Sequence, residues 1–162
     1  MEFVVDDAQI GDTLRLQSPR TVRIRGRATG RTDFTHVELI HNGEVIATVD
    51  SQAKEGHFVA DLDKEFTLGK PGWLALRTPL NQTTNVFGNP VYSHTSPVYV
   101  EYLGHRMFQP AVARELIAEM QQSLKTIDDK STFANEAERT TVVKVYQRAI
   151  ATLTKRIEDS NP

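Results

Sequence analysis

The stretch Val37-Glu38-Leu39-Ile40-His41-Asn42-Gly43-Glu44-Val45-Ile46-Ala47 decides the fold of the first two thirds of the chain. Two runs rich in apolar residues flank the dipeptide Asn42-Gly43. Asn-Gly in this setting favours a two-residue turn of type I′, because both central residues of that turn need positive φ. The stretch therefore predicts a β-hairpin over residues 35–49.

Alternating residues outside this hairpin predict further strands. Residues 21–28 place Val22, Ile24, Gly26 and Ala28 on one face and three arginines on the other, which is typical of a half-buried strand. Gly26 indicates a bulge or a point of close packing. The other expected strands cover residues 13–16, 57–66, 73–77 and 92–102, the last interrupted by Pro97, which suggests an edge or a bulge.

About seven strands without intervening helical patterns favour an immunoglobulin-like antiparallel β-sandwich. A closed barrel is the weaker alternative. The chain has no cysteine, so this sandwich would lack a disulfide. Residues 79–89 are polar and predict the longest loop. The single tryptophan, Trp73, is expected at the centre of the core, where its large side chain would bury the most surface.

At Gln109-Pro110 the hydrophobic period changes to that of an α-helix,. Proline suits the first helical turn, residues 128–131 break the pattern, and Asn135 with Glu138 has the spacing of a capping box. Short connections pair helices antiparallel. We therefore expect two domains: a sandwich over residues 1–108, and a two-helix antiparallel hairpin over residues 109–162 packed on it. The apolar stripes of the two helices comprise Ala113, Leu116, Ile117, Met120, Leu124, Ile127, Val142, Tyr146, Ala149, Ile150, Leu153 and Ile157.

The composition is that of a soluble globular protein. The chain has 162 residues, 39% of them hydrophobic and 25% charged, with a net charge of −2. This balance gives no indication of nucleic-acid or membrane binding. The first residues lack the features of a signal peptide and begin in mid-pattern, so we expect Met1 to follow a boundary within a longer protein. The compartment, including export of that parent protein, stays open.

No catalytic constellation is present in the sequence. The five histidines are scattered without metal-binding spacing,. Asp61, Asp63 and Glu65 alternate on one strand face, which indicates a row facing water or, as the alternative, a calcium site. We therefore predict no catalytic residue, no metal and no cofactor.

Six arginines within 17 residues form the strongest local anomaly: Arg15, Arg20, Arg23, Arg25, Arg27 and Arg31. Arg23, Arg25 and Arg27 share one strand face. Three interpretations are open: a solvated face paired with acidic residues of the neighbouring strand, a site for anions or glycans, or a surface that docks another domain.

Three segments carry a resemblance to a known family. They are Asn89-Pro90-Val91-Tyr92-Ser93-His94-Thr95-Ser96-Pro97-Val98-Tyr99-Val100, the hairpin quoted above, and Gly72-Trp73-Leu74-Ala75-Leu76-Arg77. Together with the tail Ala134-Asn135-Glu136-Ala137-Glu138-Arg139, they resemble the C-terminal region of the CehA/McbA family of metallohydrolases. In that family a metal-dependent hydrolase domain of PHP type comes first, and a β-rich domain with a helical tail follows.

The resemblance implies a non-catalytic accessory or interaction domain of a larger hydrolase-like protein, with the preceding hydrolase domain as partner. The family's metal ligands belong to that preceding domain, so no catalytic role transfers to this chain. His94 has two interpretations: a structural side chain at the bend before Pro97, or a contact with the preceding domain. The possible interaction surface thus comprises Arg23, Arg25, Arg27 and His94.

The sequence leaves two alternative functions open. A carbohydrate-binding module of the β-sandwich type needs exposed aromatic side chains on one face, and an enzyme in its own right needs a catalytic site. The aromatic candidates, most of which we expect in the core, are Trp73, Phe87, Tyr92, Tyr99 and Tyr102.

Overall fold

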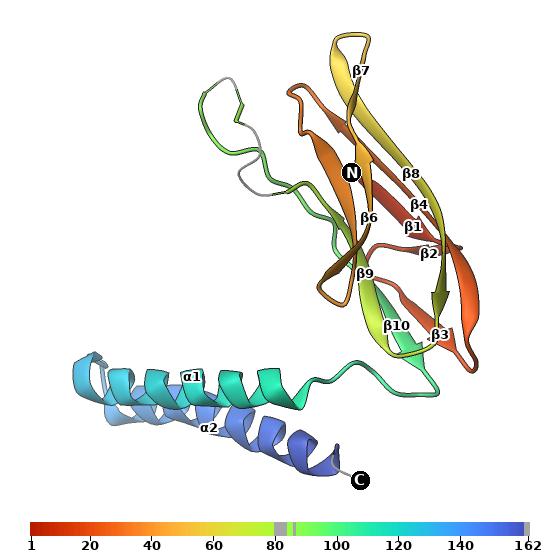
Figure 1. Cartoon of the computed structure of the whole chain (residues 1–162). Helices are drawn as coiled ribbons and strands as arrows, with labels where there is room; N and C mark the ends of the chain where they lie inside the picture. Colours follow the sequence, from red (N-terminus) through yellow and green to blue (C-terminus); the bar gives the residue numbers. More distant parts are fainter. Residues whose placement is uncertain (80–83, 86, 161–162) are drawn as a thin grey trace. The chain divides into compact units, whose positions relative to one another are not determined.

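The computed structural model describes residues 1–79, 84–85 and 87–160 and is mainly β, with two five-stranded sheets followed by two helices (Figure 1). The chain divides into two compact units, Met1–Met107 and Phe108–Pro162. Much of the loop predicted over residues 79–89 falls on residues 80–83 and 86, outside the described residues. In the described part of the chain, no helix is long and apolar enough to cross a membrane.

The first sheet has the strand order β2-β1-β4-β8-β7 and the second the order β3-β10-β9-β5-β6. The first sheet consists of β1 (Glu2–Val5), β2 (Ala8–Gln9), β4 (Arg20–Gly30), β7 (Gln52–Lys54) and β8 (His57–Leu68). The second consists of β3 (Thr13–Leu16), β5 (His36–His41), β6 (Glu44–Asp50), β9 (Gly72–Arg77) and β10 (Val98–Tyr102). The sequence did not predict β1, β2 and β7, which are only two to four residues long.

The expectation of a wholly antiparallel body is wrong at one strand pair. Strand β3 runs parallel to β10, with Thr13 opposite Tyr99 and Leu16 opposite Tyr102. The other described strand pairs are antiparallel. A tight hairpin forces antiparallel pairing, whereas a long connection leaves both directions open. Most of the first unit separates β3 from β10, so no turn dictates their direction.

The hairpin predicted around Asn42-Gly43 is confirmed. Asn42 has φ 55° and Gly43 has φ 94°, and β5 pairs antiparallel with β6 up to His41 opposite Glu44. Asn42 also ties the turn to β9. Its Oδ1 accepts a hydrogen bond from the Trp73 backbone N–H at 2.9 Å, and its own N–H donates to the Trp73 carbonyl at 3.1 Å.

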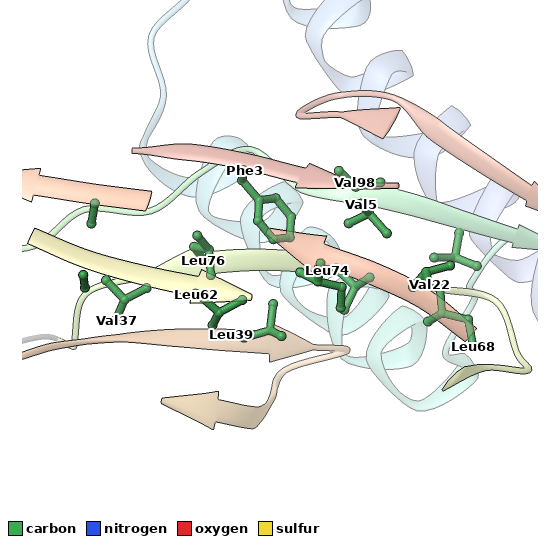
Figure 2. Packing of buried hydrophobic residues seen from close by; sticks show 14 of the residues in the cluster. Phe3, Val5, Val22, Val37, Leu39, Leu62, Leu68, Leu74, Leu76 and Val98 are labelled. Atoms are coloured by element: carbon green, nitrogen blue, oxygen red, sulfur yellow. The ribbon is translucent and has the colours of Figure 1, made fainter. Parts of the chain in front are cut away.

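Inward-facing residues of both sheets form one hydrophobic core (Figure 2). Val22, Ile24 and Ala28 of β4 lie in it, as their alternation predicted. The prediction for Trp73 is wrong, because its side chain is partly exposed and lies outside this cluster. Leu74 occupies an inward position of β9, and successive side chains of a strand point to opposite faces.

Gly26 marks a point of close packing between the two sheets. A Cβ atom on Gly26 would lie 2.3 Å from Cδ1 of Leu76, and Leu76 is fully buried. The pairing of β4 with β8 runs without a register shift from Arg20 to Gly30. Of the two interpretations of Gly26, close packing is therefore confirmed and a bulge is not.

The second unit contains α1 (Pro110–Lys130) and α2 (Glu136–Asp159), which contact each other. The predicted cap is present, because Asn135 Oδ1 accepts a hydrogen bond from the Glu138 N–H at 2.9 Å. The Glu138 carboxylate in turn accepts one from the Ala134 N–H at 2.8 Å. Among the described helical residues only Ala113 is fully buried, and the other members of the apolar stripes are partly or largely exposed.

Replacing Gly26 with alanine is expected to lower the free energy of unfolding by about 1–3 kcal/mol, the usual cost of overpacking a core. Chemical denaturation followed by circular dichroism measures this change. Gly69→Ala is the matched control, because its Cβ would meet nothing closer than 3.7 Å. Equal stability of the two variants would contradict the close-packing assignment.

His41 is a buried titratable group at the end of β5, with 8% of its surface exposed. Its ring packs edge-on against Phe66, with 5.0 Å between ring centroids. Within the described residues, its Nε2 atom has no hydrogen-bond partner. Burial, and secondarily the charge of Lys70, lowers the pKa of His41 below 6.5, while Glu44 opposes the shift. The folded state therefore favours the neutral imidazole.

This depressed pKa predicts a pH-dependent stability. The contribution of neutral His41 is fully present above pH 6.5, its unfolded pKa, and declines as pH falls from there toward the folded pKa. The difference in unfolding free energy between wild type and His41→Leu should therefore shift in favour of the variant between about pH 7.5 and about pH 5. Denaturant titrations at both pH values measure it, and a pH-independent difference would contradict the assignment.

Candidate functional site

A groove of about 450 Å³ lies on the outer face of the second sheet. Strand β9 supplies Trp73, Ala75 and Arg77, which alternate with the core leucines. Tyr99 of β10 is the register partner of Trp73 and is 47% exposed. The groove is lined by Ile40, Gly43, Trp73, Ala75, Leu76, Arg77, Tyr92, His94, Thr95, Pro97 and Tyr99.

One wall of the groove is the irregular segment before β10. The Thr95 N–H donates to the Leu76 carbonyl at 2.9 Å, and His94 forms an isolated antiparallel bridge with Arg77. The strand predicted over residues 92–102 is confirmed only from Val98 to Tyr102, because residues 92–97 form no regular strand. Pro97 has no N–H and precedes β10; the edge position that it suggested is wrong, since β10 lies between β3 and β9.

This wall holds Tyr92 and His94 together. Their ring centroids lie 5.7 Å apart at an interplanar angle of 51°. His94 Nδ1 lies 3.1 Å from the Thr95 carbonyl oxygen, which can only accept, so Nδ1 carries the proton in this contact,. The remaining nitrogen, Nε2, can then accept a hydrogen bond from a ligand.

The polar end of the groove is organised by an ion pair. Arg77 Nε donates to Glu38 Oε2 at 2.5 Å across β9 and β5. The Glu38 side chain is only 14% exposed, and His36 Nε2 lies 3.6 Å from its other oxygen. In the described part of the chain, the Arg77 guanidinium donates only through Nε. Its terminal nitrogens therefore keep donors for a ligand.

The predicted arginine surface lies on the outer face of the first sheet and faces acidic residues of β8. Arg23 donates two hydrogen bonds to Asp63, at 2.8 and 2.5 Å, and Arg27 lies 3.6 Å from Asp61. The Asp63 hydrogen bond raises the pKa of Arg23, and the same bond lowers the pKa of Asp63. Of the three arginines, Arg25 alone has no carboxylate within 4 Å among the described residues.

The predicted interaction residues therefore do not form one surface. The side chains of Arg23, Arg25 and Arg27 lie on the outer face of the first sheet, and His94 lies on the outer side of the second. The shared core lies between these two faces. Of Asp61, Asp63 and Glu65, the carboxylates of the alternative calcium site, the first two each pair with an arginine, and Glu65 is the register partner of Arg23. Among the residues that the structure describes, no group of three or more His, Asp or Glu side chains is placed to hold a metal.

Sequence reasoning missed Arg77 as a groove residue, and it named Trp73, Tyr92 and Tyr99 only as candidates of the carbohydrate-binding alternative. It also assigned most of the five aromatic candidates to the core, and this is wrong: Phe87, Tyr92 and Tyr99 are exposed, and none of the five is fully buried. The missed signal is the alternation within residues 72–77. Two leucines share one face there, so Trp73 has to point to the other.

Comparisons with protein-family models, curated proteins and solved structures find no match for this chain. The resemblance to the CehA/McbA family therefore stays a prediction that rests on the quoted motifs.

The position of Trp73 outside the core has a measurable consequence. Trp73→Ala should cost less unfolding free energy than truncation of a core residue, because the indole lies outside the core cluster and is partly exposed to water,. The neighbouring Leu74→Ala should cost about 2–5 kcal/mol, because Leu74 is completely buried,. Thermal and denaturant unfolding measure both variants. A larger loss of unfolding free energy for Trp73→Ala than for Leu74→Ala would show that Trp73 contributes to the core.

Proposed function

We propose that the chain is a non-catalytic accessory module that binds another molecule through the groove around Trp73. The observation that carries this proposal is the gathering of three aromatic side chains, Trp73, Tyr92 and Tyr99, on one solvent-facing surface. Ligand sites are concave, mostly apolar and lined by aromatic side chains with a few polar groups. The groove has this composition, with Arg77 and His94 as its polar groups.

The fold proposed for this module is an immunoglobulin-like β-sandwich followed by an antiparallel αα-hairpin. Two sheets that share one core support the sandwich,. Two observations support the hairpin. Leu116 and Met120, in the first half of α1, line one cavity with Leu153 of the second half of α2, and Asp128 near the end of α1 pairs with Arg139 near the start of α2.

The groove is a better candidate for binding than the arginine surface. Arg23, Arg27 and Arg77 each face a carboxylate of a neighbouring strand, but only Arg77 lines a groove together with Trp73, Tyr92 and Tyr99. The aromatic rings of the groove have no comparable role in the core. Exposed apolar surface of this kind marks interaction sites.

Two occupants of the groove follow from different arguments. The resemblance to the CehA/McbA family favours a preceding metal-dependent hydrolase domain as partner, with His94 in the contact. The outward position of Trp73 and Tyr99 favours a carbohydrate, because sugar rings stack on aromatic side chains through their C–H groups. Both occupants make the chain an accessory module.

A binding panel tests the proposed function. The panel contains neutral, acidic and basic oligosaccharides, a proline-rich peptide, and any domain encoded directly upstream of this chain, expressed separately. At least one of them should bind wild type, and Trp73→Ala should weaken that binding about tenfold or more, because the central aromatic contact is lost. Isothermal titration calorimetry measures the affinities.

Arg23→Ala is the matched control, since Arg23 lies on the outer face of the other sheet. It should leave binding unchanged. Binding that depends on Arg23 but not on Trp73, or no binding by any member of the panel, would contradict the proposal. Hydrolysis by the purified chain with added divalent metals, abolished by His94→Ala, would also contradict it.

A further inference from the structure

Resting on the proposed function, we infer that the groove takes an acidic oligosaccharide. A sugar ring stacks on Trp73 and Tyr99, and the carboxylate of a uronic acid unit accepts hydrogen bonds from Arg77. The two contacts define opposite ends of one site on the same face of β9.

The charges around the groove favour an anion. Arg77 is the charged residue of the lining, and no carboxylate is part of that lining among the described residues. The nearby glutamates on the same sheet face are already engaged: Glu38 with Arg77, and Glu101 with Arg15 and Arg106. Among the residues that the structure describes, a positively charged ligand would find no acidic side chain in the groove lining.

Arg77 is held in place for this contact. Glu38, on β5, bonds its Nε, and the bridge partner His94 lies on the other side of β9. The terminal nitrogens of a guanidinium fixed in this way match the two oxygens of a carboxylate. Because Glu38 fixes the side chain before the ligand arrives, less rotamer entropy is lost on binding.

The backbone separation of Trp73 and Arg77 favours a ligand of more than one sugar ring. Trp73 and Arg77 are four residues apart on one strand, which corresponds to about 13 Å at 3.3 Å per residue. A single sugar ring cannot stack on Trp73 and reach Arg77 at the same time. A chain of linked rings can, so affinity should rise from the monosaccharide to the trisaccharide.

The aromatic contact also provides the measurement. Trp73 is the only tryptophan of the chain, so its fluorescence reports on the groove alone. The probes are trisaccharides of galacturonic, glucuronic and mannuronic acid, each compared with its neutral counterpart of the same linkage and with the acidic monosaccharide. At least one acidic trisaccharide should shift the emission and protect Trp73 from acrylamide quenching, with affinity about tenfold or more above its neutral counterpart.

A double variant separates the acidic contact from stacking. Arg77→Gln combined with Glu38→Gln removes both charges and keeps a hydrogen-bonding pair. It should abolish the preference for acid over neutral sugar without abolishing stacking. The matched control, Arg23→Gln combined with Asp63→Gln, neutralises the comparable cross-strand pair of the first sheet and should keep that preference. Thermal unfolding checks that both double variants are folded.

Three outcomes would overturn the inference. They are equal affinity for the acidic and neutral trisaccharides, an acid preference that survives in the Arg77/Glu38 double variant, and the absence of binding by all three acidic trisaccharides. If a neutral sugar or an upstream domain still bound in a Trp73-dependent way, the proposed function would stand and only this inference would fail.

Discussion

The close approach of β4 to β9 is the constraint on which the first unit depends. Gly26 leaves no side chain between its backbone and Leu76, so the sheets meet where a Cβ atom would overlap the leucine. Leu74 and Leu76 then fill the inner face of β9 completely. Since the inner positions are occupied, the large indole of Trp73 has to face outward. The tight core and the exposed aromatic groove are thus two faces of the same strand.

The Asn42-Gly43 turn links this core to the groove. Type I′ geometry requires positive φ at both residues, and the Asn42 side chain uses the resulting position to accept a hydrogen bond from the Trp73 backbone. Gly72 makes room for that side chain, because a Cβ there would lie 2.3 Å from Asn42 Oδ1. The Asn42-Gly43 turn, which forms the hairpin, therefore also fixes the backbone at Trp73, the aromatic residue in the groove.

Local patterns predicted much of the fold because they act over a few residues. The alternation of β4, the Asn-Gly turn and the cap at Asn135 each depend on neighbours in sequence, and the structure contains all three. The parallel pairing of β3 with β10 could not be predicted, because residues far apart in the chain decide it. The prediction for Trp73 is wrong because the size of a side chain does not decide which face of a strand it occupies. Trp73 precedes the buried Leu74 and therefore points to the opposite face,.

The candidate site was harder to predict because charge density in the sequence does not show which arginines are paired. Of the three interpretations of the arginine cluster, pairing with acidic residues of the neighbouring strand is confirmed for Arg23 and Arg27, which lie beside Asp63 and Asp61. No sequence pattern indicated Arg77 as a binding residue. In the structure Glu38 binds the Nε atom of Arg77, and the terminal nitrogens of the guanidinium keep their donors. Arg23 is held by two hydrogen bonds to one carboxylate, whereas Arg77 is held at a single nitrogen beside aromatic rings, which leaves its other donors for a ligand. Which carboxylate each arginine meets therefore follows from the register of the strands, as the pairing of Glu38 with Arg77 across β5 and β9 illustrates.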